Sequence, residues 1–341
     1  MKALLLDEIE KMRIADIPIQ EPGAEEVLIR VEAAGLCGSD FHIYHGTYPA
    51  QYPLVQGHEF SGVIEKTGKD VTEWKVGQRV TADPNIYCGH CYYCLKDQEN
   101  MCENAQASGV TRNGAFAEYV TVPQTQLYQL PDSISFEEGA LIEPLACVLY
   151  GVKRLKLPYG SRVIIFGAGP MGLLLLKALA TGGASRIAVI DIDKKCLERA
   201  ANCGATDVFA SGQEAKAAFP RGFDAVVDAT GNPRVIEEMF LTAGKRAKIL
   251  QFGCADTNAK ITVSPYEFYD NDWEYIGTRT AVYTFGQSID MIAGGRISVK
   301  DVISECVSLE TLETYLKNGK PAGTLKIIVH PAGNKKDTIM R

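Results

Sequence analysis

The chain has no stretch of about 18 uninterrupted apolar residues, so the sequence offers no segment suited to a membrane-spanning helix. Basic residues are nowhere gathered into a block, and 35 Lys and Arg stand against 42 Asp and Glu, for a net charge of -7. Because polyanions select a basic surface, this balance argues against non-specific binding to nucleic acid or to anionic membranes. No internal repeat or low-complexity segment is visible either.

A secretory signal is also missing from the sequence, because the apolar run that begins at Met1 is broken at Asp7. We therefore expect a cytoplasmic protein, in which the 10 cysteines stay reduced. The 341 residues suffice for two domains of roughly 100 to 200 residues, which bury their cores without disulfides. A cluster among the cysteines then indicates a metal site or a catalytic group.

Two different patterns divide the chain. Up to about residue 145, short β segments such as 27–33, 62–66 and 117–122 alternate with turns that contain Gly and Pro, which predicts a mostly-β domain. From about residue 160, apolar strands alternate with helices, a pattern that requires a parallel sheet wrapped by helices. The expected order is strand 163–166, helix 170–182, strand 187–190, helix 196–203, strand 225–228, helix 233–243 and strand 247–252.

The tail from about residue 285 is too short to form a third domain. We expect it to contain helices near 286–294 and 309–318 and a strand at 324–329, and we assign it to the first domain. The predicted domains are therefore residues 1–147 with 285–341, including a lobe at 85–105, and residues 148–284.

A glycine-rich turn stands between the first predicted strand and the first predicted helix of the second domain. Gly167, Gly169 and Gly172 form the pattern Gly-x-Gly-x-x-Gly, and the next strand ends at Asp191. The first glycine permits a tight turn, the second lets the backbone approach a pyrophosphate, and the third allows the helix to pack closely on the strand. The helix N-terminus adds N–H donors and a positive dipole, so we predict dinucleotide binding.

Asp191 makes NAD the preferred dinucleotide. Its carboxylate can accept hydrogen bonds from both ribose hydroxyls, and its charge would repel the 2′-phosphate that distinguishes NADP. Lys194 and Lys195 follow closely and could tolerate a phosphate, which leaves NADP open.

Four cysteines cluster within the predicted lobe, with the spacing Cys-x2-Cys-x2-Cys-x7-Cys. Cys88, Cys91, Cys94 and Cys102 can close a tetrahedral shell around one zinc ion, and such a shell leaves no position for substrate. We therefore predict a structural zinc. The alternatives are free thiols and an iron-sulfur cluster, since ferredoxins use similar spacings. His90 also lies inside the lobe, but it is not needed as a ligand because the four cysteines already complete the shell.

A second set of possible ligands is scattered over the first domain. One thiol, Cys37, one imidazole, His58, and the carboxylates of Glu59 and Glu143 would leave a zinc ion with an open position for water or a substrate oxygen. The spacing alone leaves the alternative that these residues belong separately to the core, to a turn and to a helix start.

The whole chain resembles the zinc-containing medium-chain dehydrogenase/reductase family. The resemblance rests on five segments in the family's order, namely 35–42, 57–62, the four-cysteine lobe, 143–145 and 167–172. Within the family, the combination of Gly-His-Glu with Glu-Pro is most similar to the branch of polyol (sorbitol, xylitol, arabitol) and threonine dehydrogenases. The resemblance implies an α/β protein with a GroES-like mostly-β catalytic domain and a Rossmann domain with a doubly wound parallel sheet.

The same resemblance implies a role for individual residues. Cys37 and His58 would bind the catalytic zinc, with Glu59 as a ligand or close neighbour and Glu143 bound directly or through water. Ser39 and His42 would relay the substrate proton, and Arg279 would reach the substrate. The cofactor would contact residues of the glycine turn, Asp191 and two later backbone segments, namely Gly167, Gly169, Pro170, Met171, Gly172, Asp191, Phe252, Gly253, Cys254, Ile276, Gly277 and Thr278.

The implied reaction is hydride transfer between NAD and a secondary alcohol, with two zinc ions per subunit. The expected substrate is a polyol that is oxidised to the ketose, and the alternatives are a polyol phosphate, an aldonate or an amino-alcohol such as threonine. A nucleotide-binding sensor without catalysis is the non-enzyme alternative. The resemblance also leads us to expect a homodimer or homotetramer.

Overall fold

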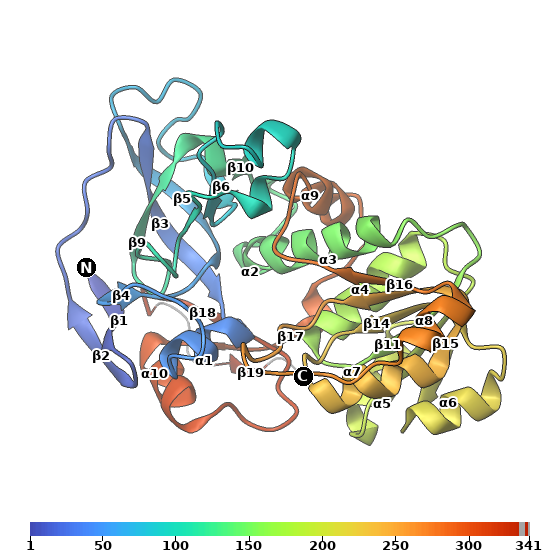
Figure 1. Ribbon diagram of the computed structural model, residues 1–341. Coiled ribbons are helices and arrows are strands. Elements are labelled where there is room, and N and C mark those ends of the chain that lie inside the picture. Colours follow the sequence, from blue (N-terminus) through green and yellow to red (C-terminus); the bar gives the residue numbers. More distant parts are fainter. Residues whose placement is uncertain (334–337, 340–341) are drawn as a thin grey trace. The chain divides into compact units, whose positions relative to one another are not determined.

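The computed structural model describes residues 1–333 and the backbone of residues 338 and 339. Residues 334–337, 340 and 341, which fall in the predicted first domain, lie outside the described residues. The chain divides into two compact units (Figure 1). The first unit contains Met1–Ala146 together with the chain from Val282 onward, and the second unit contains Cys147–Ala281.

The first unit is mostly β structure. An eight-stranded sheet has the order β10-β6-β5-β3-β18-β17-β19, with β9 also paired to β3, and smaller sheets have the orders β2-β1-β4 and β7-β8. The tail contributes to the large sheet, because β18 pairs antiparallel with the end of β3. The elements are β1 (Lys2–Glu8), β2 (Lys11–Asp16), β3 (Glu26–Gly35), α1 (Gly38–Tyr44), β4 (Leu54–Val55), β5 (Glu59–Thr67), β6 (Arg79–Ala82), β7 (Asn85–Ile86), β8 (Gln106–Ala107), β9 (Tyr119–Pro123), β10 (Leu127–Gln129), α2 (Phe136–Ala140), α9 (Phe285–Ala293), β17 (Ile303–Val307), α10 (Leu309–Asn318), β18 (Lys326–Val329) and β19 (Thr338–Ile339).

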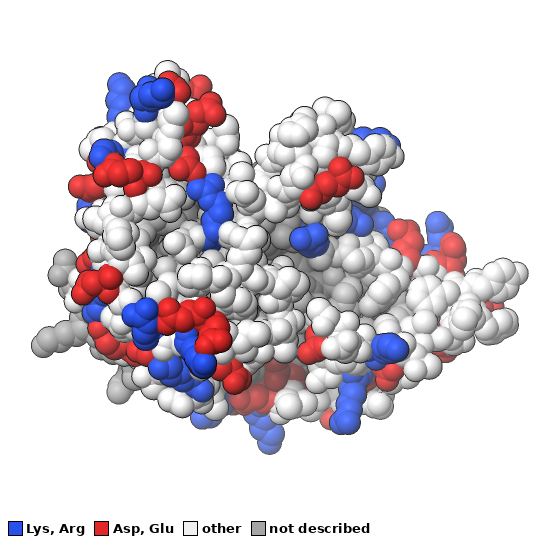
Figure 2. Space-filling view, turned by 60° about the vertical axis from the view of Figure 1, so that its left-hand side comes forward, with Lys and Arg blue, Asp and Glu red and all other residues white. Residues whose placement is uncertain are grey.

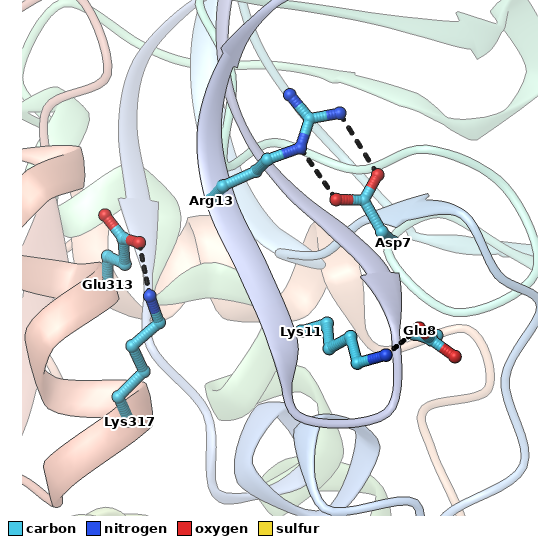
Figure 3. Close-up of polar contacts among 6 residues, drawn as sticks. All are labelled: Asp7, Glu8, Lys11, Arg13, Glu313 and Lys317. Atoms are coloured by element: carbon cyan, nitrogen blue, oxygen red, sulfur yellow. Dashed lines mark hydrogen bonds and ion pairs between the residues drawn. The ribbon is translucent and has the colours of Figure 1, made fainter.

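Apolar side chains from β1, β3, β5 and β6 form the core of this unit, together with side chains of α10 and β18. Exposed ion pairs on its surface add little stability in comparison. Figure 3 shows three of them: Arg13 contacts Asp7 through two hydrogen bonds of 2.7 and 3.2 Å, Lys317 contacts Glu313 at 2.6 Å along α10, and Lys11 contacts Glu8 across the β1–β2 turn.

The second unit is a six-stranded parallel sheet with the order β13-β12-β11-β14-β15-β16. Helices lie on both sides of it (Figure 1), as the alternating pattern predicts, and this is the doubly wound arrangement that the family resemblance implies. Strand β11 in the middle of the sheet is buried over Val163–Phe166, as expected for a strand covered on both faces. The elements are β11 (Arg162–Phe166), α4 (Pro170–Thr181), β12 (Arg186–Ile190), α5 (Lys194–Asn202), β13 (Asp207–Phe209), α6 (Gly212–Ala218), β14 (Phe223–Asp228), α7 (Pro233–Met239), β15 (Ala243–Gln251), α8 (Pro265–Asn271) and β16 (Glu274–Gly277), and α3 (Ile142–Leu155) begins in the first unit and ends in the second.

One predicted helix is shorter than expected. The sequence pattern predicts a helix over 233–243, but α7 ends at Met239 and β15 already begins at Ala243. The residues between them form a single 3-10 turn, in which the Thr242 hydroxyl donates to the Met239 carbonyl at 2.9 Å. Ala243 then pairs with Phe223 of β14, so strand pairing ends the helix.

The described part of the chain contains no helix with the length and apolar character needed to cross a membrane. On the face shown in Figure 2, acidic and basic side chains are interspersed rather than gathered by sign. This surface agrees with the absence of a basic block in the sequence.

Gly62 provides a test of the packing that holds β5 against β3. A Cβ atom at Gly62 would lie 2.1 Å from the Arg30 carbonyl oxygen, which is fixed in the β3 backbone. We expect Gly62→Ala to lower the free energy of unfolding of the first unit by about 2 to 4 kcal/mol. The measurement is the thermal unfolding midpoint.

Gly286→Ala is the matched control. Gly286 lies in the first turn of α9, and nothing lies within 4 Å of its added Cβ. Alanine should raise the unfolding midpoint there, since it removes about 0.5 to 1 kcal/mol of backbone entropy cost. A Gly62→Ala protein as stable as the wild type would contradict the assigned β3–β5 packing.

Candidate functional site

The four-cysteine lobe has the geometry of a closed zinc site. Within the described chain, the sulfur atoms of Cys88, Cys91, Cys94 and Cys102 all lie within 4.8 Å of one another. The Cys91–Cys94, Cys88–Cys102 and Cys88–Cys94 sulfur separations are 3.5, 3.6 and 4.0 Å. A tetrahedron with zinc–sulfur bonds of 2.3 Å has edges of about 3.8 Å, so the four thiols fit zinc without rearrangement.

Backbone N–H groups of the lobe favour the metal-binding thiolate form of Cys88, whereas burial raises the pKa of the Cys94 thiol to about 12. N–H groups of His90 and Cys91, together with Asn104 and Cys102, lower the pKa of the Cys88 thiol to about 6. The His90 ring does not enter the sulfur cluster, because its Nδ1 lies 2.7 Å from the Cys88 carbonyl oxygen. Four sulfur ligands leave no open position, which makes this a structural rather than a reactive site.

A second group of ligands forms where β3 and β5 meet. Gly35, the last residue of β3, pairs with Glu59, the first residue of β5, and Cys37 follows as the N-cap of α1. This pairing places the Cys37 sulfur, a His58 ring nitrogen and a Glu59 carboxylate oxygen within 4.8 Å of one another. One sulfur, one nitrogen and one oxygen are a ligand set that zinc accepts while keeping a further position open.

Buried atoms without hydrogen-bond partners indicate where an ion fits. Within the described chain, His58 Nδ1, Glu59 Oε2 and Asp40 Oδ1 are all buried and make no hydrogen bond. Leaving such atoms unpaired is costly, whereas a bound cation would compensate the carboxylates. This chemistry, rather than the residue types alone, makes the site suitable for a divalent metal.

Asp40 contacts two members of the ligand group, Cys37 and His58, although no sequence pattern predicts a role for it. Its side chain is fully buried, and its Oδ2 accepts from the Cys37 backbone N–H at 2.9 Å. Its Oδ1 lies 3.7 Å from His58 Nδ1. Burial opposes the charged imidazolium, but Asp40 and Cys37 together raise the pKa of His58 well above its ordinary value. The same negative potential would attract a metal cation.

Glu59 forms a buried ion pair with Lys326 of β18. Neither side chain is exposed by more than 4%, and Lys326 Nζ also lies 3.4 Å from the Leu36 carbonyl oxygen. Burial opposes its charge, but Glu59 and Cys37 raise the pKa of Lys326, so the ammonium stays charged. Lys326 holds Glu59 Oε1, and Oε2 remains for the ligand group. Gly35 makes room, because a Cβ there would lie 2.2 Å from Oε2.

Glu143 is placed near this group but is not one of its members. It lies buried in the first turn of α3, and its charge acts on both His58 and Lys326. The three-residue group contains only Cys37, His58 and Glu59. A direct or water-mediated bond from Glu143 to the metal therefore stays a prediction.

The two predicted relay residues lie on α1. The Ser39 hydroxyl is 3.4 Å from His58 Nε2, and His42 Nδ1 is 2.9 Å from the Thr47 hydroxyl oxygen. Residues three apart on a helix share a face, so Ser39 and His42 project to the same side of α1.

The glycine turn of the second unit has the predicted local geometry. Gly167 has a φ of 105°, and Gly169 is the N-cap of α4, with Pro170 in its first turn. A Cβ at Gly172 would lie 1.9 Å from the Gly167 carbonyl oxygen, so only glycine fits. β11, which leads into the turn, is the strand at which the sheet order reverses, the usual place for a nucleotide in such sheets.

Asp191 follows β12 and is already bonded to the turn. Its Oδ2 accepts from the Ala168 N–H at 2.8 Å, and its Oδ1 accepts from the Asp193 N–H at 2.9 Å. Each carboxylate oxygen can accept a further bond, so both ribose hydroxyls can still be bound. Among the predicted cofactor residues, Gly253 also lines a pocket of about 220 Å³ together with Gln251 and Tyr275.

Comparison with known proteins places the chain in a family. Residues 23–132 match the alcohol dehydrogenase GroES-like domain, and residues 170–294 match the zinc-binding dehydrogenase family. The chain therefore belongs to the zinc-binding medium-chain dehydrogenases, which are oxidoreductases.

Individual relatives are similar over almost the whole chain. Sorbitol dehydrogenase of Bacillus subtilis is 31% identical, over 97% of this chain and 97% of its own. D-arabinitol dehydrogenase 1 of Uromyces fabae is 30% identical, over 93% of each chain. A Sinorhizobium meliloti protein described as a zinc-binding dehydrogenase, solved with NADP, has a TM-score of 0.94 and 31% identity, over 97% of this chain and 99% of its own.

The Lys326–Glu59 ion pair gives a test of the second ligand group. Lys326→Met leaves the Glu59 carboxylate buried without a cation, so the metal-free protein should lose about 3 to 5 kcal/mol of stability. Added zinc should restore part of this loss, because Glu59 can then pair with the metal. The measurement is the unfolding midpoint with chelator and with zinc.

Lys326→Arg is the control, since it keeps the charge and should lose less stability than Lys326→Met. If the methionine variant responds to zinc no more strongly than the wild type, Glu59 does not face the metal site.

Proposed function

We propose that this protein is an NAD-dependent, zinc-dependent dehydrogenase that oxidises a secondary hydroxyl of a polyol to the ketone. The observation that carries the proposal is the group of Cys37, His58 and Glu59, in which three different ligand atoms lie within 4.8 Å and two buried atoms lack partners. The names of the sorbitol and arabinitol relatives support an open-chain polyol as substrate.

In this proposal the first unit supplies the metal site and the second unit the nucleotide site. When bound, zinc would act as a Lewis acid on the substrate hydroxyl, and NAD would accept the hydride. Cys37, His58 and Glu59 would hold the metal, with Glu143 as a further carboxylate at the site. Asp40 would fix the Cys37 backbone, and Lys326 would restrict Glu59 to one free oxygen.

The proton released from the substrate would leave through Ser39 and His42. Thr47 Oγ1 donates to the His42 carbonyl oxygen at 3.3 Å, so its lone pair accepts from His42 Nδ1–H. Nε2 is then the basic nitrogen of His42 and the atom that takes the proton from Ser39. Arg279, at the end of the second unit, is proposed to bind a substrate hydroxyl.

For the cofactor, we propose contacts to the glycine turn (Gly167, Gly169, Pro170, Met171 and Gly172), to Asp191 and to two backbone segments. These segments, which we propose to face the nicotinamide half of the cofactor, are Phe252, Gly253 and Cys254 after β15, and Ile276, Gly277 and Thr278 at the end of β16. The chain is also proposed to act as a homodimer or homotetramer.

A substrate screen and one cysteine variant test the reaction. The rate of NADH formation is followed by its absorbance. We expect it to be higher with sorbitol, xylitol or arabitol than with sugar phosphates, aldonates or threonine. Cys37→Ser should lower turnover at least about a hundredfold, because a hydroxyl is a poorer zinc ligand than a thiolate. It should also lose one of two zincs per chain, one for each ligand group, and keep its affinity for NADH.

Cys203→Ser is the control, because Cys203 is the C-cap of α5 and belongs to neither ligand group. A Cys37→Ser protein with full turnover would remove the metal site from the reaction. A wild type that binds NADH but oxidises no alcohol in the panel would favour a nucleotide sensor.

Asp191 tests the choice of cofactor. Asp191→Ala should weaken NADH binding by roughly tenfold through the loss of charge-assisted hydrogen bonds to the ribose, and should weaken NADPH binding less. Isothermal titration with both nucleotides measures the ratio of the two dissociation constants. Tighter binding of NADPH than of NADH by the wild type would show that Asp191 does not select NAD.

A further inference from the structure

A buried carboxylate lies at the end of β14, directly beside the turn that follows this strand. Asp228 is fully buried, and none of the ion pairs among the described residues includes it. Its two oxygens accept hydrogen bonds instead. Oδ1 accepts from the Thr230 N–H at 2.8 Å and the Thr230 hydroxyl at 2.7 Å, and the Gly231 N–H lies 3.0 Å from Oδ2. Such donors are what an unpaired buried carboxylate requires.

Gln251, the last residue of β15, connects this carboxylate to the next turn. Its Nε2 donates to Asp228 Oδ2 at 2.7 Å and to the Gly253 carbonyl oxygen at 2.7 Å. Its Oε1 accepts from the Tyr275 hydroxyl of β16 at 2.9 Å, which fixes the orientation of the amide. Three neighbouring strands therefore contribute one side chain each, Asp228, Gln251 and Tyr275, to a single hydrogen-bond network.

The hydrogen-bond network joins the turn after β14 to the turn after β15, and these two turns are packed backbone against backbone. The Phe252 and Gly253 N–H groups both donate to the Asp228 carbonyl oxygen. A Cβ at Gly253 would lie 2.2 Å from the Gly231 nitrogen, and a Cβ at Gly231 would lie 2.2 Å from the Cys254 carbonyl oxygen. No side chain fits between the turns, so these polar contacts, together with the pairing of Asp228 with Gln251 in the sheet, fix their relative position.

We infer that Asp228, Gln251 and Tyr275 are positioning residues that hold the Phe252–Cys254 backbone in the conformation that binds the nicotinamide half of the cofactor. The inference rests on the proposed function, which assigns this backbone to the cofactor. Asp228 does not act as a ligand itself, because its oxygens are taken up by the donors of both turns. Fixing a binding segment before the ligand arrives lowers the entropy lost on binding.

The residues of the network differ in how directly they contact the Phe252–Cys254 backbone. Gln251 bonds directly to Gly253, whereas Tyr275 acts only by orienting the Gln251 amide. Asp228 and its bonds to Thr230 and Gly231 remain when Gln251 is replaced, so the rest of the unit stays supported. A residue that merely stabilised the fold would affect all nucleotide fragments alike.

Two nucleotides separate positioning from general stabilisation. NADH contains the nicotinamide half and ADP-ribose lacks it, and both are titrated calorimetrically into the metal-loaded full-length protein. Gln251→Met should raise the dissociation constant of NADH by about tenfold and that of ADP-ribose by less than about twofold. Tyr275→Phe should act in the same direction with about a threefold effect on NADH.

The control variants are Gln213→Met and Tyr269→Phe. Both residues are exposed in the same unit, and we expect them to change neither dissociation constant. Equal weakening of NADH and ADP-ribose by Gln251→Met, or no effect on either, would overturn the inference. A wild type that binds neither NADH nor NADPH would instead refute the proposed function, and this outcome is visible before any variant is made.

Discussion

The pairing of Gly35 with Glu59 is the contact on which the metal site depends. It joins the end of β3 to the start of β5 and brings together a thiol, an imidazole and a carboxylate from separate parts of the sequence. The position opposite Glu59 must be glycine, because any Cβ would occupy the space of the carboxylate oxygen. A backbone hydrogen-bond ladder thus sets the position of side chains that carry the chemistry, with no flexible loop between the ladder and the ligands.

Charge is buried around this contact in a balanced way. Glu59 pairs with Lys326, and Asp40 lies beside His58, whose pKa Asp40 raises. Among the described residues Glu59 Oε2 still has no hydrogen-bond partner, a cost that a bound metal cation would remove. The arrangement explains how a mostly-β unit tolerates a cluster of ionisable groups in its interior, and why metal binding and stability are linked there.

The second unit differs from the first, because its proposed cofactor site consists mainly of backbone N–H and carbonyl groups rather than charged side chains. Close packing is achieved with glycine at Gly172, Gly231 and Gly253, where a Cβ would collide with backbone atoms. Polar side chains at the strand ends then fix the turns: Asp191 holds the glycine turn, and Asp228 with Gln251 holds the turns after β14 and β15. The carboxylates of Asp191 and Asp228 thus order the backbone of these turns.

The fold class and the four-cysteine site could be predicted from the sequence because their signals are local, whereas Cys37, His58 and Glu59 are scattered along the chain and only the family resemblance joins them into one site. Strand and helix periodicities, the Gly-x-Gly-x-x-Gly turn and the spacing from Cys88 to Cys102 are all contained within short segments. The end of the helix predicted over 233–243 was wrong, since strand pairing of Ala243 overrides helical propensity. The roles of Lys326, Asp228 and Gln251 could not be read from any motif. Lys326 reaches Glu59 only because β18 lies beside β3, and Gln251 reaches Asp228 only because β15 lies beside β14. The sequence by itself thus determined the residue types and local turns, whereas the tertiary structure decided which buried charges meet, because burial and strand neighbours are properties of the folded chain alone.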